Sequence, residues 1–253
     1  MVLLTMFFMG CALGFVGAGG AGVVIAVLVT VFAVPIHVAL GTSLSAMAFT
    51  TVSGALSHFR EGNVVLRIGV VMGLFGAGGA FAGAKISASL PGPLMHWLTG
   101  GMLLFSACLI YMKVFLPHSG PFSRVPSVTL TQGRRFWLTA LLAGLLNGLL
   151  SGTFGIGATA FIQLTLLLCF GLSLRESVGT TMLVILPIAV LGGLGYMTSG
   201  FLDFQLFVQV VLGLMGGAYL GAKGTRRLPR NVLKVSMVAV PVIGALLLFF
   251  GGH

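Results

Sequence analysis

The sequence has little charge and almost no acid. Only 6% of its 253 residues are charged and three are acidic, against 58% that are hydrophobic. Such a chain has too little polar surface to cover a soluble globule. Its apolar runs are about 20 residues long and lack the alternation of lipid-facing strands. We therefore expect an all-α integral membrane protein whose backbone groups are paired internally.

Chemistry-bearing residues are also scarce. The three acids, Glu61, Glu176 and Asp203, fall near segment ends, and together with five histidines they form no catalytic or metal-binding set. We expect no enzyme activity, no metal and no cofactor. The three cysteines are isolated in apolar runs. No GxxxxGK[ST] loop occurs, which argues against an ATP-driven pump.

The net charge of +10 does not indicate a nucleic-acid partner. The basic residues lie between apolar segments rather than on a soluble basic face, and a positive-inside bias explains them more simply. The first ten residues have neither a positive n-region nor a cleavage site, so we expect a membrane segment there and not a signal peptide.

The sequence does contain an internal repeat. Fourteen residues recur 138 positions later without a gap, which is the mark of a duplicated unit. The first set is Gly10, Gly14, Gly17, Gly19, Gly41, Thr42, Gly54, Gly62, Gly78, Gly79, Gly83, Ala84, Lys85 and Pro91. Transporters are commonly built from duplicated halves that enclose a substrate site.

Each half contains four apolar segments, and a Pro- and Arg-bearing linker, 116–135, separates the halves. The first repeat is then 1–115 and the second 136–253. The expected segments are 2–34, 38–58, 64–89, 94–115, 136–171, 177–198, 204–222 and 232–250.

The first segment of each half is too long for one ordinary span. A glycine cluster interrupts each, at 17–22 and 152–157, and glycine in these clusters predicts a helix break. Each flank has about 14 to 16 residues, or about 21 to 24 Å, which is short for a crossing. A re-entrant hairpin and two short tilted helices both fit.

The positive charges favour an inverted topology. If each long first segment crosses once, the 13 Lys and Arg residues divide seven against six. If each enters and leaves on the same side, twelve share one side and only Lys85 lies opposite, as the positive-inside rule requires. This places both termini outside, the linker 116–135 in the cytoplasm and the two repeats in opposite orientations.

The residues that repeat resemble the TauE/SafE sulfite exporters, also described as toluene-sulfonate uptake permeases. The resemblance covers nearly the whole chain. It rests on the glycine-rich first segments and on four motifs in duplicated order: Gly41-Thr42-Ser43, Gly179-Thr180-Thr181, Gly79-x-x-x-Gly83-Ala84-Lys85 and Gly217-x-x-x-Gly221-Ala222-Lys223. It implies a small prokaryotic inner-membrane transporter of sulfite, sulfonates or related organosulfur anions.

The glycine breaks are the leading substrate-binding candidates. A helix broken in the membrane exposes N–H groups with partial positive charge, and glycine lets an anion approach them. Close helix packing is the competing interpretation of the same glycines. The candidate glycines are Gly17, Gly19, Gly20, Gly22, Gly155 and Gly157.

Polar side chains near the breaks are further candidates. Hydroxyls of the repeated motif are expected either to cap a helix or to bind the anion: Thr42, Ser43, Thr180 and Thr181. The second broken segment also has a polar lining that the first lacks, at Asn147, Ser151, Thr153 and Gln163, with helix contact as the alternative. Lys85 and Lys223 are expected to snorkel to the interface or to attract anions.

These features predict a secondary transporter that exports a small sulfur-containing oxyanion by alternating access between the repeats. Uptake of an organosulfur or small carboxylate anion is the alternative. An intramembrane enzyme and a passive structural subunit fit the sequence less well. The coupling ion, with a proton as one possibility, and the oligomeric state stay open.

Overall fold

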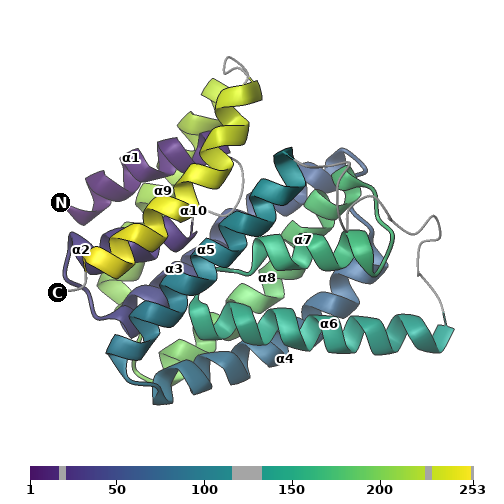
Figure 1. The fold of residues 1–253 in the computed structure, drawn as a ribbon, viewed down its shortest axis with the longest axis horizontal. Helices are drawn as coiled ribbons and strands as arrows, with labels where there is room; N and C mark the ends of the chain where they lie inside the picture. Colours follow the sequence, from purple (N-terminus) through teal and green to yellow (C-terminus); the bar gives the residue numbers. More distant parts are fainter. Residues whose placement is uncertain (17–20, 116–132, 226–229, 252–253) are drawn as a thin grey trace.

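The computed structural model describes residues 1–16, 21–115, 133–225 and 230–251, and it confirms the all-α expectation because the described chain contains helices and no strand (Figure 1). The helices are α1 (Val2–Val16), α2 (Ala21–Thr30), α3 (Ile36–Arg60), α4 (Leu66–Ser89), α5 (Gly92–Phe115), α6 (Gly133–Phe154), α7 (Thr159–Leu168), α8 (Leu174–Thr198), α9 (Phe204–Thr225) and α10 (Arg230–Phe250).

Several helices have the length and composition of membrane spans. Within the described chain these are Ile36–Arg60, Leu66–Ser89, Gly92–Met112, Gly133–Phe154 and Arg175–Thr198. The other helices contribute shorter apolar stretches of 10 to 17 residues. A multi-pass membrane protein follows from these spans. The six helices expected after the first segments agree with α3, α4, α5, α8, α9 and α10 to within three residues at each end.

The long first segment of each half is broken, as the glycines predict. In the second half the chain leaves helix between α6 and α7, where Gly155, Gly157 and Ala158 have φ values of +65°, +67° and +42°. Such left-handed backbone favours glycine. In the first half α1 ends at Val16 and α2 begins at Ala21, and residues 17–20, where the first glycine cluster predicts a break, lie outside the described residues.

The two helices that flank the second break differ in length more than the sequence suggested. The expected 14 to 16 residues on each side of the break are wrong for the second half, where α6 has 22 residues and α7 has 10. α6 begins at Gly133, three residues before the expected segment. It also continues through the first glycine of the cluster, so that Gly152 and Thr153 belong to its last turn. Gly22 likewise lies in α2, not in the break.

α6 and α7 form an antiparallel hairpin. The ring of Phe136 near the start of α6 lies against that of Phe170, just after α7, with centroids 6.1 Å apart. Farther along, the side-chain amide of Asn147 donates to Thr165 Oγ1 at 3.1 Å. The segment therefore begins and ends at the same end of the bundle.

The halves interlock through their glycines. α4 packs against α6, and α1 packs against α9 in the same way. A Cβ added at Gly79 would overlap the carbonyl oxygen of Leu145, and one at Gly217 would overlap that of Phe7. These two contacts are the same contact displaced by 138 residues, with the halves exchanged. Close backbone approach of this kind is the usual function of small residues in membrane helices.

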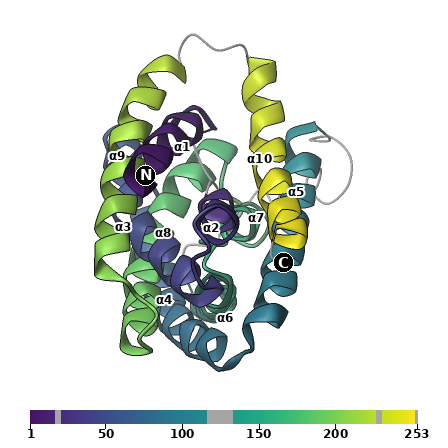
Figure 2. The same ribbon diagram turned by 90° about the vertical axis from the view of Figure 1, so that its left-hand side faces the viewer.

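α3 and α8, which occupy equivalent places in the two repeats, pack against each other in opposite directions. Gly41 lies against Tyr196 and Gly179 against His58, so the start of each helix meets the end of the other. Figure 2 shows the short helices α2 and α7 toward the middle, with longer helices around them. Buried apolar side chains of both short helices, such as Ile25, Leu28 and Ile162, belong to the core.

Candidate functional site

The second glycine break lies against the N-terminal half of α3. A Cβ at Gly155 would meet the backbone of Leu40, and one at Gly157 would overlap the side chain of Met47. Met47 is 11 residues from the start of α3, or about 16 Å at 1.5 Å per residue. Leu40 lies only about 6 Å from that start, so non-helical backbone is buried along the N-terminal half of a spanning helix. Transporters bind their substrates at buried irregular backbone of this kind.

The start of α2 contacts the same face of α3 as the second glycine break. The hydroxyl of Ser43 donates to the carbonyl oxygen of Ala21 at 3.2 Å. Ser43 and Met47 are four residues apart and share a face of α3. The beginning of α2 and the break before α7 therefore contact the same face of α3.

The N-terminus of α7 has free amides. Ile162 donates to the carbonyl of Ala158 at 2.9 Å, so the N–H groups of Thr159, Ala160 and Phe161 have no partner within the helix. The N-cap residue is Ala158, and among the described residues no side chain caps this end. A buried, uncapped helix start with partial positive charge is a site for an anion.

Free hydroxyls accompany these amides. Ser151 Oγ and Thr159 Oγ1 are buried and have no hydrogen-bond partner within the described parts of the chain. Ser151 lies in the last turn of α6 and Thr159 opens α7, so they flank the break. On α3, Thr42 Oγ1 is also buried without a described partner. Because an unpaired buried hydroxyl is costly, such groups point to a bound polar ligand.

Other predicted hydroxyls are engaged by backbone. Thr180 Oγ1 accepts a hydrogen bond from the amide of Val65 at the start of α4, at 3.0 Å. Thr181 donates to the carbonyl of Ser177 at 2.7 Å, and Thr153 donates to that of Gly83 at 3.4 Å. Thr180 thus binds backbone at the start of α4, and helix capping was the alternative to anion binding that the sequence left open.

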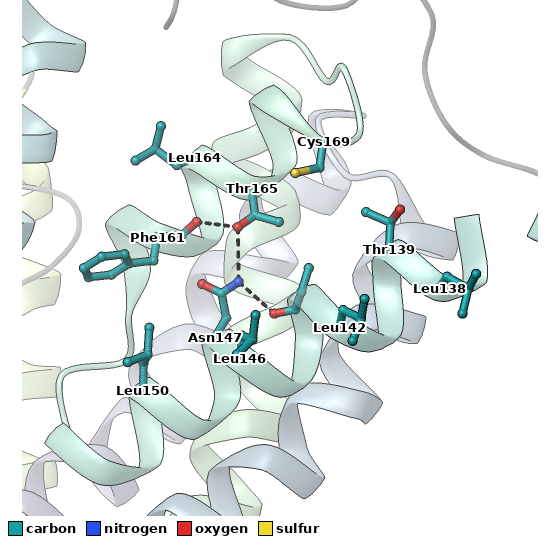
Figure 3. Close-up of a pocket in the computed structure, with 11 residues that line it drawn as sticks. Leu138, Thr139, Leu142, Leu146, Asn147, Leu150, Phe161, Leu164, Thr165 and Cys169 are labelled. Carbon is teal, nitrogen blue, oxygen red and sulfur yellow. Dashed lines mark hydrogen bonds between the residues drawn. The ribbon is translucent and has the colours of Figure 1, made fainter. Parts of the chain in front are cut away.

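Asn147 faces a cavity of about 500 Å³ between α6 and α7 (Figure 3). Its amide also donates to the carbonyl of Ala143 at 2.8 Å. The lining is mostly apolar, and the hydroxyl of Thr165 is engaged by protein because it donates to the carbonyl of Phe161. An apolar cavity of this kind is a poor anion site. Gln163 is buried in α7, and its backbone carbonyl accepts a hydrogen bond from the hydroxyl of Ser177.

The remaining candidates lie apart from the break. A Cβ at Gly22 would overlap Leu103 of α5, so Gly22 serves helix packing. Lys85 is exposed, with Nζ 5.7 Å from the centroid of the Phe81 ring. Lys223 belongs to α9, but its side chain lies outside the described residues, as do Gly17, Gly19 and Gly20 altogether.

Two residues near the break were missed from the sequence. Tyr196, on α8, is fully buried, and its hydroxyl lies 2.8 Å from the carbonyl oxygen of Gly152. Ser87, near the end of α4, lies 2.9 Å from the same hydroxyl. A signal existed for Tyr196, since it stands 138 positions after His58 and each repeat therefore has a polar ring at that place.

The site consists of hydrogen-bond donors without a charged partner. Among the described residues, no group of three or more His, Cys, Asp and Glu is placed to hold a metal ion. Amides and hydroxyls around a buried break can bind an oxyanion reversibly, because they offset its charge without a tight ion pair.

Comparison with known proteins finds relatives of the whole chain among membrane transporters. The family model of the sulfite exporter TauE/SafE matches residues 2–248. The probable membrane transporter protein YdhB of Bacillus subtilis (strain 168) is 51% identical over 250 residues, which cover 99% of this chain and 100% of that protein.

More distant relatives include a probable membrane transporter protein of Xylella fastidiosa (strain 9a5c), 24% identical over 92% of this chain and 89% of its own. Another is YunE of Bacillus subtilis (strain 168), also named a probable membrane transporter protein. It is 25% identical over 85% of this chain and 82% of its own length. No solved structure matches the chain. This chain matches one family model from residue 2 to 248, and its duplicated, glycine-broken segments agree with that match. It belongs to the TauE/SafE sulfite exporter family.

Proposed function

We propose that this protein is a secondary transporter that exports a small sulfur-containing oxyanion, such as sulfite or a sulfonate. The buried N-terminus of α7 carries the proposal, since its free amides lie beside the unpartnered hydroxyls of Ser151 and Thr159. These donors suit the oxygens of an oxyanion. The export direction follows the description of the family.

We further propose that the two repeats are inverted in the membrane and alternate access to the site. The contacts of α3 with α8 support this arrangement, because equivalent helices that run in opposite directions belong to oppositely oriented halves. The return of the α6–α7 hairpin to its own end supports the same topology. Together with the positive-inside rule, this leads us to propose that both termini lie outside and the 116–135 linker in the cytoplasm.

The proposal is tested by efflux from liposomes loaded with labelled sulfite, and separately with a labelled sulfonate. We expect protein-dependent efflux that saturates with substrate concentration. A folded, reconstituted protein that moves neither anion would overturn the proposal.

Single donors at the site give a sharper test. Ser151→Ala removes a free hydroxyl and should raise the apparent KM roughly 10-fold, because a hydrogen bond to a charged group contributes about 1.5 kcal/mol. Thr198→Ala is the matched control, since its hydroxyl donates only to the carbonyl of Gly195 on its own helix. An unchanged KM in Ser151→Ala would exclude that hydroxyl from the site.

Uptake of an organosulfur anion is the second candidate, because one site between two inverted repeats can serve either direction. Cells that express the protein distinguish the two. Export predicts resistance to external substrate, whereas uptake predicts accumulation of labelled substrate.

A further inference from the structure

The C-terminal end of α6 is buried, so its last carbonyl oxygens need donors from outside the regular helix. The amide of Gly155 donates to the carbonyl of Ser151 at 2.9 Å. The next two carbonyl oxygens, of Gly152 and Thr153, lie 2.8 and 3.2 Å from the hydroxyl of Tyr196. One buried side chain from α8 therefore serves two carbonyls at the edge of the break.

The chemistry of the groups fixes the direction of these hydrogen bonds. A carbonyl oxygen only accepts, so the single phenol proton is donated to a carbonyl of α6. Ser87 Oγ lies 2.9 Å from the phenol oxygen and can donate its own proton to it. Tyr196 also packs closely against Gly41, where an added Cβ would meet the Cβ of Tyr196 at 2.8 Å.

The position of this hydroxyl matters because opposite helix ends meet at the break. The carbonyl end of α6 has a partial negative charge, and the amide end of α7 has a partial positive charge. Only residues 155–158 separate them. An anion at the start of α7 is attracted by the amides and repelled by the nearby carbonyls. A proton donated to those carbonyls offsets the repulsion.

We propose that Tyr196 is a positioning residue that shields the anion site from the carbonyl end of α6. This inference rests on the proposed function, since it assumes that the transported anion binds at the start of α7. His58 is at the equivalent position of the first repeat, with its Cβ 3.1 Å from the place of a Cβ at Gly179. Both repeats thus place a polar ring at this point of the α3–α8 pair.

The test compares Tyr196→Phe with wild type in liposomes, using methanesulfonate as a monoanion and sulfoacetate as a dianion. Removing the hydroxyl leaves the ring in place and exposes the carbonyls to the substrate. Electrostatic energy is proportional to charge, so a roughly 3-fold rise in KM for the monoanion implies a roughly 9-fold rise for the dianion. The maximal rate should stay near that of wild type.

A merely structural role gives a different result. Loss of correctly folded protein lowers the maximal rate and leaves the ratio of the two KM values unchanged. Ser199→Ala is the matched control, because its hydroxyl donates to the carbonyl of Gly195 within the end of α8. We expect wild-type KM values for both anions in this variant. An unchanged KM ratio in Tyr196→Phe, with wild-type transport of both anions, overturns the inference but not the proposed function.

Two further outcomes are decisive. If Tyr196→Phe does not fold, Ser87→Ala replaces it, because that variant removes the donor to the phenol and keeps the tyrosine. We then expect the same change in KM ratio at smaller size, and an unchanged ratio overturns the inference. A wild-type protein that moves neither anion overturns the proposed function and this inference together.

Discussion

At the scale of single residues, neighbouring glycines have different functions. Gly79 faces α6, where a Cβ would overlap the carbonyl oxygen of Leu145, whereas Gly78 has nothing within 4 Å. Both lie in α4, so they share the cost of glycine in a helix, roughly 1 kcal/mol relative to alanine. Only Gly79 is needed for close approach.

This difference predicts the effects of two alanine substitutions. Gly79→Ala should lower the free energy of unfolding by about 1 to 3 kcal/mol, because a backbone carbonyl cannot move aside for the new methyl group. Gly78→Ala should be neutral or stabilising by up to about 1 kcal/mol. Thermal unfolding in detergent measures both. Equal stability of the two variants would contradict the close α4–α6 contact.

At the scale of elements, the α6–α7 hairpin makes the proposed topology of the second half testable. Cys169 follows α7 directly, and Arg134 lies in the first turn of α6. Since the hairpin returns to its own end, we predict that a membrane-impermeant thiol reagent labels Cys169 and an Arg134→Cys variant from the same side. Ser89→Cys, at the end of α4, should be labelled from the opposite side.

The labelling needs a controlled background and pH. Cys11 and Cys108 are replaced by serine throughout, and Cys169 is replaced as well in the variants that carry a new cysteine. Burial raises the pKa of the Cys169 thiol, so the reactive thiolate becomes more abundant as the pH rises and labelling should be faster at mildly alkaline pH. Labelling of Cys169 from the same side as Ser89→Cys would mean that the segment from α6 to α7 ends on the opposite side of the membrane from its start.

At the scale of the whole molecule, the α3–α8 pair joins the two halves. A Cβ at Gly54 would lie 3.5 Å from Met182 Cγ, so cysteines at these positions are placed for a disulfide. Alternating access requires the halves to move against each other. We predict that oxidation of the double variant Gly54→Cys with Met182→Cys stops anion flux and that a reductant restores it. Gly54→Cys alone should keep its flux, and full flux in the oxidised double variant would exclude movement at this contact.

Much of the architecture could be predicted because it depends on local composition and on the repeat. Apolar length indicated the spans, and α4 ends at Ser89 as expected. Glycine clusters located the breaks, since only glycine readily adopts the backbone seen at Gly155 and Gly157. The predicted lengths of the helices that flank the second break were wrong because Gly152 stays helical, where it is packed against Ala80 of α4.

The candidate site was predicted less well, because a hydroxyl in the sequence does not reveal its partner. Thr180 belongs to the same duplicated motif as Thr42, yet the first accepts from the amide of Val65 and the second has no described partner. Ser151 was predicted among other polar residues, and only its burial without a partner separates it from Asn147, which is hydrogen-bonded to Thr165.

The sequence by itself determined that this is a duplicated membrane protein with a broken helix in each half, because composition, spacing and glycine conformation act over short stretches of chain. The tertiary structure decided which break residues have free donors, and it placed Tyr196 at the carbonyls of α6, 43 and 44 positions away. Such partners depend on how helices distant in the chain pack together. Helix packing of that kind follows from the shapes of whole surfaces, which no short motif contains.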